Sequence, residues 1–293
     1  MNKLIFIIGE SDDPQVVALV SHLNDCDIVY FNSNTRSDFT IYHQPNIDAT
    51  EVYCCNQVLL PDAIFWRSLD YDAFEYEQDT ANGDAYLELF LHAFSDALWM
   101  NPPPAYHEHS TKIKQIRTAL DNDILMPNTV MTNDVDDAIR FLEQNGPLAL
   151  KPIAGGEYTI KIKKEKQLRK YFKEHSQPVC LQEFIEGDCI RTFVIGDICY
   201  STIIFSKGSD FRVDDDAEYY SIELGEALNT TAVVITEKLG MHWTAIDWIR
   251  SKDGKFYFLE ANFSPMFAKY ETLSMQPISQ EIAHYILDTI KRV

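Results

Sequence analysis

Two acidic residues and one asparagine near the C-terminal end of the sequence are the strongest candidates for chemistry. Asp253-Gly254 separates two β-rich runs and predicts a two-residue hairpin turn of type I′. In that register Asp247 lies directly opposite Glu260, and Asn262 shares their face because side chains alternate along a strand. Two bare carboxylates about 5 Å apart repel each other, so we expect a bound cation. Carboxylate and carboxyamide oxygens suit Mg²⁺ that is shared with phosphate.

The same register divides the other side chains of the hairpin between two faces. The face opposite the carboxylates is predicted to be core and holds Ile246, Trp248, Tyr257 and Leu259. The face of the carboxylates holds Ala245, Ile249, Phe256 and Phe258. These side chains are too apolar for open solvent, which favours a metal site over the alternative, an exposed hairpin with solvated charges.

A second candidate combines a lysine with a pair of glycines. Lys151 ends a predicted buried strand, and Gly155 and Gly156 follow it. This arrangement can place an ammonium group and bare backbone amides against a phosphate. It is not a Walker loop, because G-x-x-x-x-G-K is absent. The alternative is an ordinary turn.

Two further features could serve a nucleotide and its phosphates. The backbone of Gln182-Glu183-Phe184-Ile185 could pair with an adenine edge, and Asp188 beyond it could hold ribose hydroxyls. The guanidinium groups of Arg191 and Arg212 suit a transferring phosphoryl group or a carboxylate substrate. Taken alone, the first feature is equally an ordinary strand end, and each arginine a surface ion-pair partner.

Predicted strands and helices must position these residues, and their order indicates an α/β protein. A βαβ rhythm at the N-terminus predicts a small open α/β domain, followed by a strand-rich segment over 39–66. The predicted strands are 3–8, 27–31, 148–152, 158–163, 179–185, 190–195, 198–205, 243–250 and 255–261. The predicted helices are 15–23, 83–99, 110–122, 134–144, 165–175, 226–239 and 276–291.

The charge of the chain is strongly negative and unevenly distributed. The 293 residues, enough for about two domains, include 25 basic and 45 acidic side chains, a net charge of −20. Residues 1–100 hold only three basic side chains against 17 acidic ones. An acidic surface argues against nucleic-acid and membrane partners, because it repels phosphate backbones and anionic lipid. We therefore expect a site for a phosphorylated ligand after residue 100.

The N-terminal segment and the cysteines predict a soluble, cytoplasmic protein. The first apolar run is five residues long and ends before Gly9, too short for a signal-peptide core. No apolar stretch approaches the ~20 residues of a membrane span. The six cysteines have no metal spacing and no C-x-x-C, which favours a reducing compartment.

Taken in order, these segments resemble the ATP-grasp ligase superfamily from about Asn101 to Pro265. The resemblance implies an α/β (α+β) chain with an ATP-grasp fold and an N-terminal open α/β pre-ATP-grasp domain. It places that domain at 1–102, a central subdomain at 103–180 and a C-terminal subdomain at 181–293. The segments that carry it are Lys112-Ile-Lys-Gln115 (first nucleotide subdomain), Lys151-Pro…Gly155-Gly156 (phosphate-covering loop), Gln182-Glu-Phe-Ile185 (adenine hinge), and Asp247…Glu260-Ala-Asn262 (magnesium ligands).

The resemblance also implies a reaction and a set of roles. A substrate carboxylate attacks the γ-phosphate of ATP, and an amine, hydroxyl or thiol displaces phosphate from the acyl phosphate. ATP and two Mg²⁺ ions are the implied cofactors. The implied roles are nucleotide binding by Lys112, Lys151, Gly155, Gly156, Gln182, Glu183, Phe184, Ile185 and Asp188, catalysis by Arg191 and Arg212, and metal binding by Asp247, Glu260 and Asn262.

Two branches of the superfamily are most similar. Arg191, Asp210-Phe-Arg212 and Leu259-Glu-Ala-Asn262 resemble the glutamate ligase that modifies a ribosomal protein. Ile64-Phe-Trp-Arg67 resembles a strand in the first domain of graspetide (microviridin-type) synthetases, which close lactones or lactams on a precursor peptide. Both branches have an acid where this chain has Cys189, and Asp188 stands one residue early.

The expected substrate is therefore a ribosomally made peptide, with a free amino acid or other small carboxylic acid as the alternative. A nucleotide-binding protein without ligase chemistry is a third hypothesis. The basic residues between 161 and 173 suggest recruitment of an acidic precursor peptide, or they form a solvated helix face. We also consider a homodimer.

Overall fold

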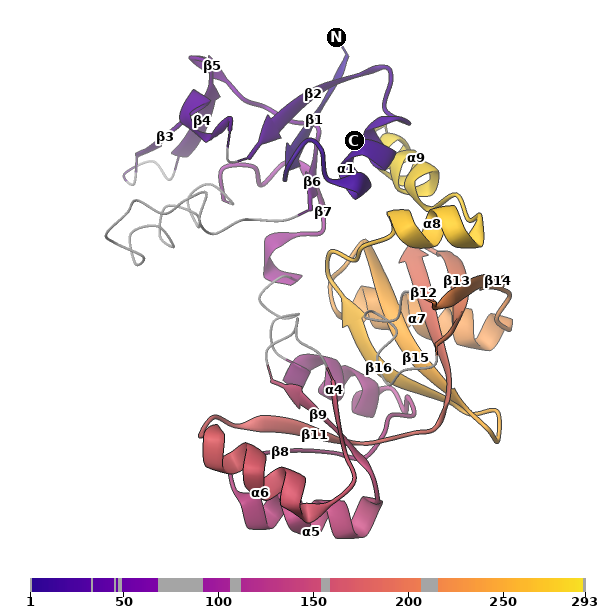
Figure 1. Cartoon of the computed structure of the whole chain (residues 1–293). Helices are drawn as coiled ribbons and strands as arrows, with labels where there is room; N and C mark the ends of the chain where they lie inside the picture. The colour runs from indigo at the N-terminus through magenta and orange to yellow at the C-terminus, as the bar shows by residue number, and fades with distance from the viewer. Residues whose placement is uncertain are drawn as a thin grey trace. The chain divides into compact units, whose positions relative to one another are not determined.

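The computed structural model describes residues 2–32, 34–44, 46, 49–67, 92–105, 112–153, 159–206 and 216–291. The chain forms two compact units (Figure 1). Unit 1 comprises Met1–Pro103, Ser264–Glu271 and Pro277–Val293, and unit 2 comprises Pro104–Phe263 and Thr272–Gln276. The residues after 263 are thus divided between the units, whereas the sequence led us to expect one subdomain over 181–293. The boundary between the two ligase subdomains, at 180/181, stays a prediction.

Unit 1 is built on a parallel sheet with the strand order β2-β1-β6-β7. The interior strand β1 has Ile5 to Ile8 fully buried, which is why this segment is continuously apolar. A small antiparallel sheet, β3-β4-β5, completes the strands described in this unit. Their bounds are β1 Lys3–Ile8, β2 Cys26–Phe31, β3 Phe39–Gln44, β4 Ala49–Cys54, β5 Gln57–Val58, β6 Ala63–Trp66 and β7 Leu98–Met100.

Helices α1 (Pro14–Val20) and α9 (Ile278–Ile290) contact each other in unit 1, and a short 3₁₀ helix spans Arg36–Asp38. Asp13 caps α1 by accepting from the backbone N–H groups of Gln15 and Val16. The helix predicted at 83–99 is wrong at its end, because Leu98–Met100 pairs with β6. A short apolar run is compatible with either a strand or a helix. Here pairing with β6 makes it a strand. Residues 83–91 lie outside the described residues.

The first sheet of unit 2 is antiparallel, with the order β10-β9-β11-β8. In Figure 1, α5 and α6 lie side by side against this sheet. Their apolar faces meet the sheet in one core that includes Leu142, Leu150, Leu168 and Leu181. The elements are β8 Thr129–Thr132, α5 Val135–Asn145, β9 Leu148–Pro152, β10 Ile160–Ile162, α6 Glu165–Glu174 and β11 Val179–Glu183.

The second sheet of unit 2 is also antiparallel, with the order β14-β13-β12-β15-β16. Strand β14 and the short helix α8 were not predicted from the sequence, while the other elements of this region fall within a few residues of their predicted bounds. The elements are α4 Lys112–Asp121, β12 Gly187–Ile195, β13 Ile198–Phe205, β14 Glu218–Ile222, α7 Glu226–Lys238, β15 Trp243–Ser251 and β16 Phe256–Asn262. Helix α8, Ala268–Ser274, begins in unit 1 and ends in unit 2.

The β15–β16 hairpin has the predicted pairing of Asp247 with Glu260, but its turn and its register near the turn differ from the prediction. Ser251 N donates to Lys255 O and Gly254 N to Ser251 O, which closes a three-residue loop with Gly254 at φ 81°. The strands near the loop are therefore one residue out of the predicted register. A β-bulge between Asp247 and Trp248 compensates, so that Asp247 pairs with Glu260 as predicted.

The bulge also changes which aromatic residues face the carboxylates. Phe258 pairs with Trp248, and their ring centroids lie 5.8 Å apart in the core. The prediction that Phe258 surrounds the carboxylates and that Tyr257 faces the core is therefore wrong, because the extra residue reverses the alternation beyond the bulge. Among the described residues, no helix is long and apolar enough to cross a membrane.

Candidate active site

The centre of the candidate site is a bidentate pair between Arg191 on β12 and Asp247 on β15. The two residues are directly paired across the sheet. Arg191 Nε lies 2.7 Å from Asp247 Oδ1, and Arg191 Nη2 lies 2.7 Å from Oδ2. Their side chains are only 10% and 14% exposed, so the pair is shielded from water. The guanidinium fork therefore neutralises one of the two opposed carboxylates.

Lys112, in the first turn of α4, neutralises the second carboxylate. Its Nζ donates to Glu260 Oε2 at 3.0 Å. Burial alone would raise the pKa of Glu260. The charges of Lys112, Lys151 and Arg191 outweigh burial and hold that pKa well below its ordinary value of 4.5. Glu260 is therefore a carboxylate at neutral pH, surrounded by cations.

Lys151, near the end of β9, is the third cation that acts on Glu260. Burial lowers the pKa of its ammonium group, and the charge of Glu260 opposes that shift. Lys151 Nζ donates to Gln182 Oε1 at 3.0 Å, and Gln182 Nε2 donates to Thr129 Oγ1 at 3.2 Å. Gln182 thus holds the lysine through its side chain, a role that the sequence does not reveal.

Asn262 completes the oxygen set that the sequence predicts for a metal. Its Nδ2 donates to Ala245 O at 3.2 Å and to Asp247 Oδ2 at 3.4 Å. Within the described ranges there is no cluster of three or more His, Cys, Asp or Glu side chains that could hold a metal. A cation would therefore need the amide oxygen of Asn262 beside the two carboxylates, and this all-oxygen set fits Mg²⁺. The metal role of these residues stays a prediction.

The predicted adenine hinge follows β11. Glu183 N donates to Asn128 O at 2.8 Å and Phe184 N donates to Pro147 O at 2.9 Å, which fixes the start of the segment. Lys161 Nζ lies 3.3 Å from the centre of the Phe184 ring. This contact between β10 and the hinge was not expected. Ile185 continues the hinge, and its predicted role is untested.

Asp188 does not join the other predicted residues. On β12 it alternates with Cys189, so it lies on the face opposite Cys189 and Arg191. Its carboxylate instead accepts from Arg250 Nη2 at 2.7 Å. This placement gives no support to Asp188 as the ribose-binding acid and puts Cys189 on the face of the site.

Three predicted residues, Gly155, Gly156 and Arg212, lie outside the described residues. Sequence reasoning also gave no role to Gln115, although it lies on the predicted Lys112-x-x-Gln115 helix. Its side chain contacts the backbone of β16 at Ala261. The spacing of three residues from Lys112 is the signal that could have indicated it, because such residues share a helix face.

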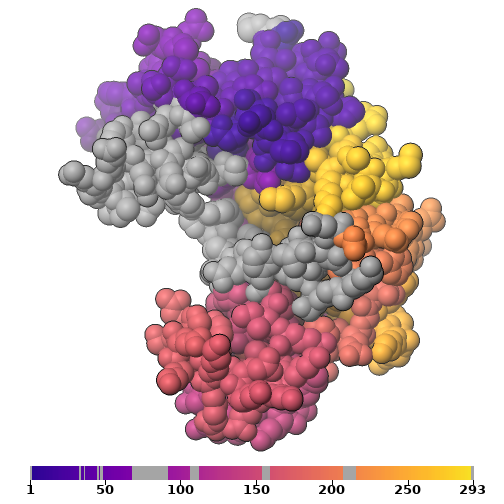
Figure 2. Space-filling model, in the orientation of Figure 1, coloured from indigo at the N-terminus to yellow at the C-terminus, as the bar shows by residue number. Residues whose placement is uncertain are grey.

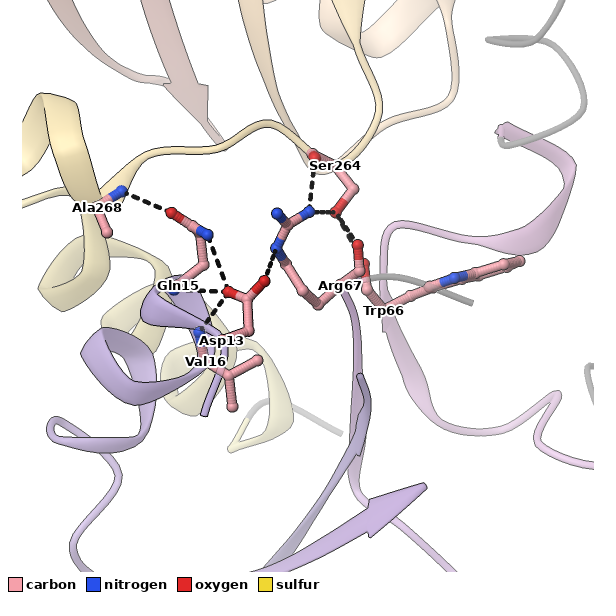
Figure 3. A network of polar contacts seen from close by, with 7 residues as sticks. All are labelled: Asp13, Gln15, Val16, Trp66, Arg67, Ser264 and Ala268. Carbon is pink, nitrogen blue, oxygen red and sulfur yellow. Dashed lines mark hydrogen bonds and ion pairs between the residues drawn. The ribbon is translucent and has the colours of Figure 1, made fainter. Parts of the chain in front are cut away.

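Unit 1 contains a separate network of buried polar residues (Figure 3). Arg67, which follows β6, forms an ion pair of 3.1 Å with Asp13 and donates to Ser264 O at 3.2 Å. Gln15 connects Asp13 to the backbone N–H of Ala268, which donates to Gln15 Oε1 at 3.1 Å. The network ties the start of α1 to the segment that begins at Ser264.

Known structures identify the class of fold. The ATP-grasp ligase PsnB complexed with minimal precursor matches 98% of this chain and 99% of that chain, with a TM-score of 0.84 and 23% identity. The macrocyclase MdnC from Microcystis aeruginosa, bound with precursor peptide MdnA, matches 97% and 99% of the chains, with a TM-score of 0.80 and 18% identity. The fold is therefore that of the ATP-grasp ligases, as the resemblance implied.

The family follows from the sequence match. The RimK-like ATP-grasp domain covers residues 109–286, so the chain belongs to this family and is an ATP-grasp ligase. The tetrahydromethanopterin:alpha-L-glutamate ligase of Methanocaldococcus jannaschii is 26% identical over 245 residues, which are 78% of this chain and 80% of the relative. A probable alpha-L-glutamate ligase of Histophilus somni is 27% identical over 277 residues, 89% and 86% of the two chains.

Proposed function

We propose that this chain is a carboxylate ligase that uses ATP and Mg²⁺ to form an acyl phosphate on a ribosomally made peptide. One observation carries the chemistry. Lys112, Lys151 and Arg191 converge on the opposed carboxylates Asp247 and Glu260. A buried cluster with more cations than carboxylates suits a polyanion that arrives with its own metal ion.

The cluster supports an exchange of partners on nucleotide binding. In the structure each carboxylate is neutralised by a protein cation, Asp247 by Arg191 and Glu260 by Lys112. Phosphate oxygens would take over these cations, and Mg²⁺ would take over the carboxylates. The exchange keeps every buried charge paired, which avoids the large cost of an isolated one.

The reaction that follows balances without an enzyme nucleophile. A substrate carboxylate oxygen attacks the γ-phosphorus of ATP, the bond from phosphorus to the β,γ-bridging oxygen breaks, and ADP leaves. An amine or hydroxyl then attacks the acyl carbon, phosphate leaves, and the nucleophile loses its proton. Arg191 supplies a fixed guanidinium fork beside the developing charge, and Lys112 and Lys151 hold the phosphates.

The residues that would hold Mg²⁺ are Asp247, Glu260 and Asn262, whose oxygens form a hard-ligand set. When bound, the ion neutralises charge on the β- and γ-phosphates. We propose two such ions, one for each opposed carboxylate. The chain's own contribution is to keep the two carboxylates opposed across β15 and β16.

A peptide substrate is supported by two features. The solved structures of PsnB with a minimal precursor and of MdnC with the precursor peptide MdnA match this chain over almost its whole length. In this chain several lysines on α6 or just before it are exposed, and α6 lies at the surface in Figure 2. Among the described residues, these exposed lysines form no ion pair: Lys163, Lys164, Lys166, Lys170 and Lys173. Their charge fits an acidic precursor peptide.

The test is turnover with peptides. The protein is incubated with ATP, Mg²⁺ and candidate acidic peptides, and ADP release is followed together with the product mass. We expect ADP and the loss of one water from the peptide for each bond that closes. ADP release without a change in peptide mass would contradict the peptide-ligase proposal.

The second candidate adds an amino acid. It is favoured by the names of the curated relatives, which include alpha-L-glutamate ligases at 26% to 28% identity. The same incubation with free glutamate distinguishes the two, because addition raises the mass of the acceptor by one residue. A nucleotide-binding protein without ligase chemistry would give neither product.

A further inference from the structure

The predicted metal ligands Glu260 and Asn262 lie on β16, an outer strand of its five-stranded sheet. Among the described strands β16 has a neighbour on one side only, so half of its backbone N–H and C=O groups point away from the sheet. Ala261 lies between the two ligands and is fully buried. How its backbone is held therefore decides how firmly the ligands on either side are placed.

Gln115 on α4 forms hydrogen bonds with both backbone groups of Ala261, the N–H and the C=O. Gln115 Nε2 donates to Ala261 O at 3.0 Å, and Ala261 N donates to Gln115 Oε1 at 2.9 Å. The side chain is 4% exposed, so these bonds do not compete with bulk water. Its carboxamide thus makes the two hydrogen bonds that a further strand would make.

The two hydrogen bonds act on two different peptide planes. Ala261 N belongs to the plane that joins Glu260 to Ala261, and Ala261 O belongs to the plane that joins Ala261 to Asn262. Because a peptide unit is rigid, fixing both planes fixes the backbone at both ligands. Lys112, one turn earlier on the same face of α4, contacts the Glu260 side chain itself.

We infer that Gln115 is a positioning residue that sets the placement of Glu260 and Asn262 for a divalent cation bound with the nucleotide. The inference rests on the proposed function, in which these two residues are metal ligands. Gln115 touches neither the metal nor the nucleotide in this account. It acts through the backbone of Ala261.

The test replaces Gln115 by methionine, which keeps the length of the side chain and removes both hydrogen bonds. Mn²⁺ is titrated into the protein saturated with ADP, and free Mn²⁺ is measured by electron paramagnetic resonance. We expect Gln115→Met to weaken Mn²⁺ binding by about 10- to 100-fold, the range seen when the partners of metal ligands are removed.

Gln276→Met is the matched control. Gln276 is also a buried glutamine of unit 2 that bonds to a strand backbone, since its Nε2 donates to Ser201 O at 2.8 Å. Both variants are expected to lower the thermal unfolding temperature. Only Gln115→Met is expected to change Mn²⁺ affinity, and equal effects of both variants on that affinity would overturn the inference.

Two further variants distinguish a failure of the inference about Gln115 from a failure of the proposed metal site. If Glu260→Gln weakens Mn²⁺ binding and Gln115→Met does not, the inference is wrong and the proposed metal site stands. If Glu260→Gln also leaves binding unchanged, both are wrong. Should Gln115→Met not fold, Gln115→Glu keeps one hydrogen bond. Its added negative charge alone would strengthen cation binding, so weaker binding supports the inference and unchanged or stronger binding overturns it.

Discussion

Each unit of this ligase contains a buried arginine–aspartate pair, and the two pairs have different surroundings. In unit 1, Asp13 Oδ1 accepts from the backbone N–H groups of Gln15 and Val16 and from Gln15 Nε2, while Oδ2 faces Arg67 (Figure 3). In unit 2, both oxygens of Asp247 face Arg191, and a second carboxylate, Glu260, is paired with it across the strands.

We propose that this difference separates a structural pair from one that exchanges partners when nucleotide and metal bind. One carboxylate oxygen of Asp13 caps helix α1 and accepts from the side chain of Gln15. Breaking the Arg67–Asp13 pair would therefore lower the stability of the fold. Asp247 has no such backbone donors among the described residues, and in the proposed function a metal ion replaces Arg191 as its cation. Burial and the chemical type of the pair are therefore poor guides to function, whereas the other partners of the carboxylate distinguish the two cases.

The largest expected effect is the loss of turnover on replacing the exchangeable arginine. Arg191→Met should lower ADP release, with a peptide that the wild-type chain modifies, by about 10³-fold, because the fixed guanidinium beside the phosphoryl group is lost. Arg250→Met is the matched control. Arg250 pairs with Asp188 on the opposite face of the same sheet, and turnover should stay within about 3-fold. Similar losses of turnover in both variants would show that Arg191 has no special role in the reaction.

The next effect is a loss of stability on replacing the structural arginine. Arg67→Met leaves Asp13 without its cation in a site where the two side chains are 9% and 20% exposed. We expect the free energy of unfolding in urea to fall by about 3–5 kcal/mol, as for other broken buried pairs. The deficit relative to wild type should be the same with and without Mg²⁺ and ADP. A deficit that disappears with Mg²⁺ and ADP would place Arg67 with the exchangeable pair.

The sequence predicts the opposed carboxylates correctly although two details of the prediction are wrong. The turn is a three-residue loop and not a type I′ turn, and the bulge at Asp247 corrects the resulting shift. Hairpin signals fix the approximate register, but bulges depend on packing against the rest of the sheet. The face of Phe258 was predicted wrongly for the same reason.

The partners of the carboxylates could not be predicted, since they depend on contacts far apart in the chain. Lys112 and Glu260 are separated by 148 residues, and Arg191 and Asp247 by 56. Local patterns place each residue on a helix or strand and do not say which helix faces which strand. The resemblance to ATP-grasp ligases implied that these lysine, arginine and carboxylate side chains belong to one site. The structure adds that the cations and the carboxylates neutralise each other.

A third prediction concerns pH and the second carboxylate. The pKa of Glu260 is lower in the folded chain than its ordinary value of 4.5, so the folded state binds fewer protons than the unfolded state. The stabilisation is present above about pH 4.5 and is lost as the pH falls toward the lowered pKa. In metal-free protein, Glu260→Gln should reduce the acid-side slope of unfolding free energy against pH. An unchanged slope would mean that Lys112 and Lys151 do not hold this charge.

The smallest effects concern a third arginine–aspartate pair, which is more exposed than the other two. Arg250 and Asp188 are 33% and 41% exposed, so Asp188→Asn should lower the free energy of unfolding by less than about 1 kcal/mol. ADP affinity, measured by calorimetry, should not change, because Asp188 faces away from Arg191. Cys189→Asp should instead strengthen ADP binding by about 3- to 10-fold, since it places a carboxylate acceptor for ribose hydroxyls on the face of the site. If Asp188→Asn weakens ADP binding and Cys189→Asp does not strengthen it, the exposed pair belongs to the nucleotide site. In that case the exposure of the Arg250–Asp188 pair would be a poor guide to its function, as burial is for the other two pairs.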